Sequence, residues 1–75
     1  MANSNPSVVQ FLAPNQCYFF DGSRIVFQSY NTIVCVIDGD NIQITKGQPQ
    51  SKTTAKYLNQ FLGIHTNYNS YKEIK

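Results

Sequence analysis

The apolar residues change from an alternating to a helical period near Ser51, and this change constrains the fold more than any other feature. Between Cys17 and Ile44, short apolar runs alternate with turn residues, a pattern typical of β-strands. After Ser51, the segment SKTTAKYLNQFLGI places apolar residues three or four positions apart, as on one face of a helix. The sequence therefore predicts an α+β fold, in which a small antiparallel sheet is followed by one C-terminal helix packed on one face.

The alternation and the turn signals predict about four strands. The turns Asp-Gly-Ser at residues 21–23 and Asp-Gly-Asp-Asn at residues 38–41 indicate tight hairpins. A further apolar run at residues 8–12 fits either an edge strand or a segment that packs over the sheet. The expected strands are residues 16–20, 24–30, 32–37 and 42–45.

The helix has recognisable start and stop signals. Ser51 or Thr53 is expected to cap its first turn by accepting backbone N–H bonds. Gly63 is expected to end it in the left-handed conformation, with Ile64 folding back onto Leu58. One buried stripe is predicted on this helix, consisting of Ala55, Leu58, Phe61 and Leu62.

The length of the chain predicts a single domain over residues 1–75. A domain of this size buries only roughly 60% of the surface that its unfolded chain exposes. Residues 1–7 are polar and contain a proline, so we expect a mobile arm there. Tyrosines alternate with polar residues in the tail at residues 66–75, and this pattern is compatible with a strand, a short helix or a disordered end.

One helix covers only one face of a small sheet, so the other face needs a partner. Alternation along the third expected strand places Cys35 and Ile37, together with Ile33, beneath the helix. Val34 and Val36 then lie on the uncovered face, which monomers usually avoid exposing. Residues 8–12, the tail, a second copy of the chain or a target protein are the possible covers, and self-association as a homodimer is the interpretation we favour.

Composition favours a protein-contact surface over a nucleic-acid surface. Charged residues make up 13% of the chain, about half of the usual share of about 25%. The net charge of +2 is far from the strongly basic surface that binds duplex nucleic acids. Nothing at the start of the chain looks like a signal peptide, and no apolar run is long enough to span a membrane. We therefore expect a soluble, intracellular protein without a membrane partner.

The residues that commonly carry chemistry form no recognisable site. Cys17 and Cys35 fall on strands separated by a third strand, roughly 9–10 Å apart, which is too far for a disulfide and suggests buried thiols in a reducing compartment. His65 stands alone, whereas zinc sites need three or four ligands at characteristic spacing. No nucleophile motif or phosphate-binding glycine loop occurs. The sequence predicts no catalytic activity, no metal and no cofactor.

Two polar clusters remain as candidate contact points. One is the turn around Tyr30, and the other is the start of the helix, where Lys52 and Lys56 accompany N–H groups that attract a phosphate or carboxylate. Together with the uncovered face and the outer helix surface, they give the predicted partner-binding residues: Tyr30, Val34, Val36, Lys52, Lys56 and Asn59.

Two segments resemble a small domain found in tailed-bacteriophage proteins. They are Ser-Tyr-Asn-Thr-Ile-Val at residues 29–34 and Lys-Thr-Thr-Ala-Lys-Tyr-Leu-Asn-Gln-Phe-Leu at residues 52–62. That domain has a Ser-Tyr-x-Thr strand start followed by a Thr-Thr-Ser-Lys-His-Leu-Asn-x-Phe-Leu helix. This chain departs from the pattern at Ala55 and Tyr57, which replace the serine and the histidine. The resemblance implies a viral origin and a shared fold, but it assigns no activity.

These observations predict a non-enzymatic bacteriophage accessory protein in the host cytoplasm. It would bind a host protein and modulate or inhibit it, in host takeover or counter-defence. Three alternatives stay open: a single-stranded nucleic-acid module that uses Lys52, Lys56, Tyr30 and Tyr57, a virion component, and a protein that sequesters a nucleotide at the helix start.

Overall fold

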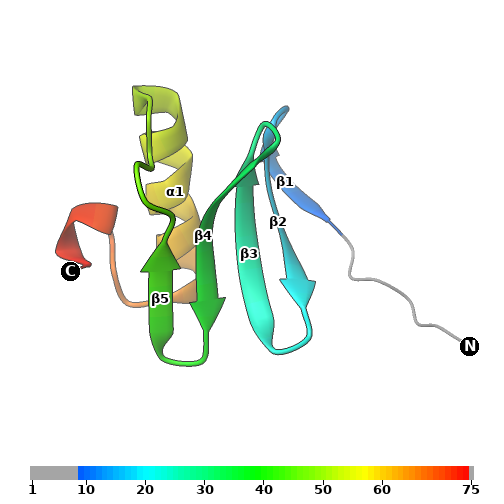
Figure 1. The fold of residues 1–75 in the computed structure, drawn as a ribbon, viewed down its shortest axis with the longest axis vertical. Coiled ribbons are helices and arrows are strands. Elements are labelled where there is room, and N and C mark those ends of the chain that lie inside the picture. The colour runs from blue at the N-terminus through cyan, green and yellow to red at the C-terminus, as the bar shows by residue number, and fades with distance from the viewer. Residues whose placement is uncertain (1–8, 75) are drawn as a thin grey trace, which may run out of the picture.

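The computed structural model describes residues 9–74, which form a five-stranded antiparallel sheet with one helix on one face (Figure 1). The strands lie side by side in chain order, and the predicted α+β class is confirmed. The edge strand β1 comes from the apolar run near residues 8–12 and adds one strand to the four expected from alternation. The expected arm at residues 1–7 lies outside the described residues. The elements are β1 (Gln10–Ala13), β2 (Gln16–Asp21), β3 (Arg24–Ser29), β4 (Thr32–Asp38), β5 (Asn41–Ile44), the helix α1 (Lys52–His65) and the 3-10 helix η1 (Tyr71–Glu73).

The helix α1 starts where the sequence predicts and ends later. The backbone N–H of Thr54 donates to Ser51 Oγ over 3.1 Å, so Ser51 is the cap. The helix continues through Gly63, whose φ is not positive, and is capped by Thr66. Thr66 donates both its backbone N–H, over 2.7 Å, and its hydroxyl, over 2.6 Å, to the carbonyl of Leu62. The predicted termination at Gly63 is therefore wrong, and Ile64 is 54% exposed instead of folding back.

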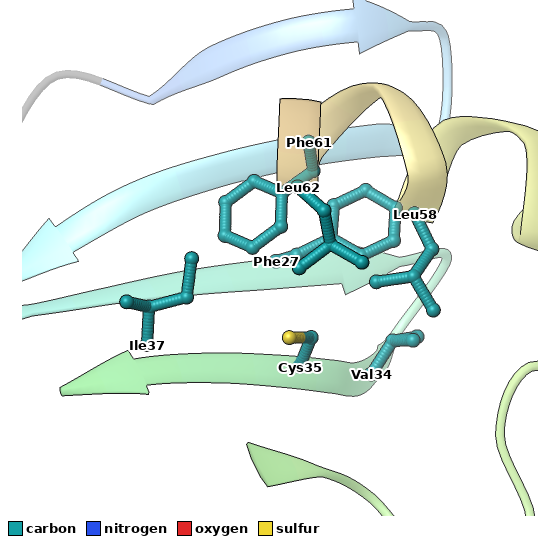
Figure 2. Close-up of a cluster of buried hydrophobic side chains, with 7 residues drawn as sticks. All are labelled: Phe27, Val34, Cys35, Ile37, Leu58, Phe61 and Leu62. Carbon is teal, nitrogen blue, oxygen red and sulfur yellow. The ribbon is translucent and has the colours of Figure 1, made fainter. Parts of the chain in front are cut away.

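The core lies between α1 and the sheet. Phe27 of β3 and Phe61 of α1 stack with ring centroids 5.3 Å apart and an interplanar angle of 24°. The predicted helical stripe is confirmed for Leu58, Phe61 and Leu62, whereas Ala55 is only half-buried. The buried apolar cluster consists of Phe27, Val34, Cys35, Ile37, Leu58, Phe61 and Leu62 (Figure 2).

A β-bulge between β3 and β4 reverses part of the predicted alternation. Phe27 pairs with Cys35 and Gln28 pairs with Ile33, so Val34 is the extra residue of β4. Val34 therefore joins Cys35 in the core and is 0% exposed, and its predicted place on the uncovered face is wrong. Ile33 moves the other way, to the face away from α1, where it is 46% exposed. Val36 pairs with Val26 on that same face, as predicted.

The tail packs against the helix, and its Ile74 also lines a hollow at the β5 edge of the sheet together with Val36 and Gln43. The backbone N–H of Tyr71 donates to Asn59 Oδ1 over 2.8 Å, and Tyr71 and Ile74 pack against the core cluster. Of the possibilities left open for the tail, a short helix is the one observed, as η1. Within residues 9–74, no helix has both the length and the apolar character needed to cross a membrane.

Candidate functional site

The face of the sheet opposite α1 is apolar, and we call it the open face. The strand register aligns its side chains, since directly opposed residues of antiparallel strands share a face. Phe11 is 67% exposed and Ile33 is 46% exposed, whereas Val26 is buried between its cross-strand neighbours. The apolar residues of the open face are Phe11, Cys17, Phe19, Val26, Ile33 and Val36.

Charge on the open face is confined to one end of the sheet. Arg24 Nη2 lies 3.0 Å from Asp21 Oδ2 in an exposed ion pair, and Asp38 is opposite Arg24 in the register. Gln28 lies within the apolar surface, opposite Cys17 and Ile33 in the register, and Gln43 lies at its margin on the edge strand β5, opposite Val36. An apolar centre with a polar margin is the usual composition of a protein–protein interface.

A second candidate lies where α1 begins, because the structure brings the two motif segments together there. Ser29 Oγ lies 3.0 Å from Thr54 Oγ1 in a buried hydrogen bond between β3 and α1. Ser51 Oγ donates to the same threonine oxygen over 3.1 Å. A hydrogen bond of this kind contributes about 1 kcal/mol net, and more is lost when one buried partner is removed. These motif residues therefore have a structural role, which is to fix the start of α1 to the β3–β4 hairpin.

A shallow hollow of about 290 Å³ adjoins this hydrogen-bonded cluster. We call it the tyrosine hollow, because Tyr30 and Tyr57 are among the residues that line it. Gln16 also lines it and is only 2% exposed, yet its Oε1 has no hydrogen-bond partner among the residues that the structure describes. The complete lining is Ala13, Pro14, Asn15, Gln16, Tyr30, Thr53 and Tyr57.

Tyr30 occupies a backbone conformation that favours glycine. Three of the four two-residue hairpin turns have a positive φ at the first turn residue: 64° at Gly22, 62° at Gly39 and 57° at Tyr30. A residue with a Cβ atom pays roughly 1–2 kcal/mol for this conformation. Backbone strain of this kind is concentrated at functional sites, and the Tyr30 side chain is 60% exposed.

The structure separates the predicted partner-binding residues into different environments. Tyr30 lines the tyrosine hollow, and Val36 lies half-buried on the open face. Val34 is in the core, so it is not available to a partner. Asn59 accepts a hydrogen bond from the tail, as described above.

The two predicted lysines lie on the exposed side of α1. Lys56 Nζ is 5.3 Å from the ring centroid of Tyr57, which places a positive charge close to the tyrosine hollow. Lys52 lines a separate shallow hollow together with Pro49 and Tyr71. Sequence reasoning missed Gln16, Phe11 and Ile33. Only Phe11 had a signal, because it belongs to the apolar run that precedes Pro14.

The thiols and the histidine are held in their uncharged forms. Burial raises the pKa of Cys35 to about 12 and also raises the pKa of Cys17, so both are poor nucleophiles near neutral pH. The ring of His65 packs 4.6 Å from that of Tyr18 and 5.1 Å from that of Phe61, and burial lowers its pKa. Over residues 9–74, no three histidine, cysteine or acidic side chains come together as a metal site would require. The expected lack of catalytic activity stays a prediction.

A family of unknown function (DUF8033) matches residues 4–75, so the chain belongs to this family. No curated protein and no solved structure matches it. The family match carries no link to bacteriophages, and a phage origin therefore stays a hypothesis that depends on the motif resemblance.

Proposed function

We propose that this member of the family is a non-enzymatic protein-binding module, and that it contacts a partner protein through the open face. The observation that carries the proposal is the exposed apolar surface around Phe11 and Ile33, on the face that no element within residues 9–74 covers. The helix packs on the other side of the sheet, and the tail packs on the helix. Exposed apolar patches with a polar margin mark protein interaction sites.

The chemistry of the open face favours a protein over a nucleic acid as its occupant. Its charged residues are two aspartates and one arginine at the hairpin end, so it offers no basic track for a phosphate backbone. Large aromatic and branched side chains such as those of Phe11 and Ile33 are the kind that contribute binding energy when a partner removes them from water.

We also propose that the free protein is a homodimer, in which a second copy covers the open face until the partner replaces it. Burial of exposed apolar surface contributes roughly 25 cal/mol per Å², so leaving this face in water is unfavourable. Light scattering after size-exclusion chromatography tests this point, since a mass of 8.5 kDa at all concentrations would be that of a monomer.

The motif resemblance supports a specific biological setting. A phage accessory protein in the host cytoplasm would act by occupying a host protein, so that the host protein is modulated or inhibited. A virion component is the alternative that also requires protein contacts. Mass spectrometry of purified particles distinguishes the two, because an accessory protein is absent from them.

The test is affinity purification from host lysate with two matched variants. Ile33→Lys adds a charge to the open face, and Ile64→Lys adds the same charge to an isoleucine of similar exposure, 54% against 46%, at the end of α1. We expect the wild type and Ile64→Lys to retain the same specific partner and Ile33→Lys to lose it. Retention of that partner by Ile33→Lys, with loss by Ile64→Lys, would contradict the proposal.

A further inference from the structure

The two edges of the sheet differ in how they are protected against an added strand. An edge strand presents unpaired backbone N–H and C=O groups, and proteins commonly protect it with a proline, a charge or a β-bulge. β1 has an irregular register between Phe11 and Ala13 and is followed by Pro14. β5, at the opposite edge (Figure 1), pairs with β4 in regular register. Its residues, Asn41–Ile44, include no charge and no proline, so within residues 9–74 it is the unprotected edge.

The free backbone groups of β5 belong to Ile42 and Ile44. Hydrogen-bonded and non-hydrogen-bonded pairs alternate along an antiparallel ladder. The N–H of Thr45 donates to the carbonyl of Val34 over 2.9 Å, which places Gln43 in the next hydrogen-bonded pair. Ile42 and Ile44 lie in the pairs between, so their N–H and C=O groups point away from β4. These donors and acceptors have the spacing that an extended chain requires for pairing.

A hollow of about 460 Å³ runs along this edge. Four consecutive residues, 42–45, line it, whereas a hollow on one face of a strand would be lined by alternate residues only. The volume exceeds that of the smallest small-molecule sites, roughly 300 Å³, so it is large enough to receive side chains of an added strand. Ile74 of the tail also lines the hollow and packs against the core cluster. An apolar side chain that enters the hollow is therefore removed from water at an apolar wall.

The β5 edge is continuous with the open face. Val36 and Gln43 line the hollow, and they lie opposite each other on the open face. A strand added at β5 extends the same sheet, and its side chain opposite Gln43 lies on the open face. One partner molecule therefore reaches both surfaces without a gap between them.

Charges at the two ends of β5 indicate the direction of the added strand. Asp40 precedes β5 and Lys46 follows it closely, and both are exposed. In an antiparallel arrangement, the first residue of the added segment lies near Lys46 and its last residue lies near Asp40. A segment that begins with an acidic residue and ends with a basic one is complementary to both charges. Apolar residues are expected opposite Ile42 and Ile44, because these side chains pack against the core cluster.

We propose that β5 pairs with an extended segment of the partner protein, which is added antiparallel to it at the edge of the sheet. Backbone hydrogen bonds to Ile42 and Ile44 supply affinity, and the side chains in the hollow supply selectivity, as in other cases of strand addition. This assignment rests on the proposed function, because the segment belongs to the partner protein. A synthetic peptide tests the edge by itself, so the edge and the open face can fail separately.

The first test is an NMR titration of the ¹⁵N-labelled full chain at low salt with the peptide Glu-Thr-Val-Thr-Val-Thr-Lys, capped at both ends. Its valines lie opposite Ile44 and Ile42 when its glutamate is opposite Lys46. We expect the amide signals of Ile42 and Ile44 to shift with increasing peptide, and those of β1 to stay unchanged. The absence of shifts in β5 at millimolar peptide would overturn the proposal, and so would an equal response in β1.

Two control peptides separate strand pairing from general attraction. Proline in place of both valines removes the N–H groups that donate to β5, so this peptide is expected to bind more than about tenfold more weakly. Exchange of the terminal glutamate and lysine places like charges beside Asp40 and Lys46, and we expect about threefold weaker binding. Equal binding of the proline peptide would contradict strand pairing. Equal or tighter binding of the exchanged peptide would contradict the antiparallel direction.

Two proline variants test the edge groups from the side of the protein. Ile42→Pro and Ile44→Pro each remove an N–H that points away from β4, and proline is tolerated at such positions of edge strands. Each is expected to fold, as urea denaturation checks, and to bind the first peptide about tenfold more weakly. Gln60→Ala, at an exposed residue of α1, is the control and should bind the peptide as the wild type does. Wild-type affinity in either folded proline variant would contradict the assignment.

Hydrogen exchange identifies the source of the added strand. In the free protein, the amides of Ile42 and Ile44 are expected to exchange faster than that of Gln43, which lies in a pair bonded to β4. In the complex recovered by affinity purification, exchange at Ile42 and Ile44 should slow by about tenfold or more. Unchanged exchange there in the complex would overturn the assignment to the partner protein. Slow exchange in the free protein that is lost on dilution would assign the edge to a second copy, and would also overturn it.

Discussion

The two faces of the sheet are both apolar, but only one of them is closed within the described chain. Beneath α1, Phe27, Val34 and Phe61 are fully buried. On the open face, Phe11 and Ile33 keep 67% and 46% of their surface in water. The difference indicates that the helix face supplies the stability of the domain, while the open face is available for contact with another molecule.

The largest expected effect is on the helix face. Phe61→Ala removes a ring that packs against Phe27 and Tyr18, with centroids 5.3 and 5.5 Å away. We expect it to lower the free energy of unfolding by about 3–5 kcal/mol, measured by urea denaturation. A loss below about 1 kcal/mol, which is the size expected for a substitution on the open face, would show that the helix face is not the source of stability.

Val34 and Val36 form a matched pair that tests the β-bulge. Val34→Ala should lower the free energy of unfolding by about 2 kcal/mol, because it removes two methyl groups from a fully buried side chain. Val36→Ala should cost less, since Val36 is half-buried on the open face. Urea denaturation of the two variants measures both losses. Equal losses would contradict the register in which Val34 faces α1.

His65 makes the stability of the helix face depend on pH. Burial lowers its pKa, so the unfolded chain takes up the proton first as the pH falls below 6.5, the ordinary histidine value. Its contribution to stability is therefore fully present above that pH and is lost as the pH falls towards the lowered pKa. We expect thermal unfolding of the wild type to move to lower temperature in this range.

The matched control for this effect is His65→Phe, which keeps a ring against Tyr18 and Phe61 but cannot be protonated. Its unfolding temperature should change less than that of the wild type over the same range of pH. An identical pH dependence in the two proteins would show that another group is responsible.

The smallest expected effect on stability comes from the open face. Ile33→Lys changes a half-exposed side chain, and strand preferences differ by no more than about 1 kcal/mol. We expect urea denaturation to show a loss within that limit, together with the loss of the partner protein in affinity purification. Unfolding of this variant would show that the open face belongs to the core.

Local signals in the sequence explain why most of the fold could be predicted. Gly22 and Gly39 identified two hairpins, and the helical period identified the buried residues of α1. The β-bulge could not be predicted, because the run Thr-Ile-Val-Cys-Val-Ile at residues 32–37 has no glycine or proline to indicate an interruption. The helix end was predicted wrongly because Gly63 looked like a terminator, whereas hydrogen bonds from Thr66 close the helix.

The candidate site could be predicted less well from the sequence than the fold. Tyr30 was named because its turn is polar and aromatic, but its backbone strain depends on which hairpin position it occupies. Gln16 gave no signal, since a glutamine at the start of a strand normally faces water. In the folded chain it is opposite Ser29 in the strand register, and Ser29 is hydrogen-bonded to Thr54 of α1.

The two cysteines offer the most direct test of the central claim, that another protein molecule covers the open face. Cys17 lies on the open face, and Cys35 is in the core as an internal reference. The rate of thiol labelling is measured for the complex recovered by affinity purification and for the free protein, diluted until light scattering gives the mass of the monomer so that no second copy covers the open face. We expect much slower labelling of Cys17 in the complex, with Cys35 slow in both samples. Labelling of Cys17 at the same rate in the intact complex as in the free protein would contradict it.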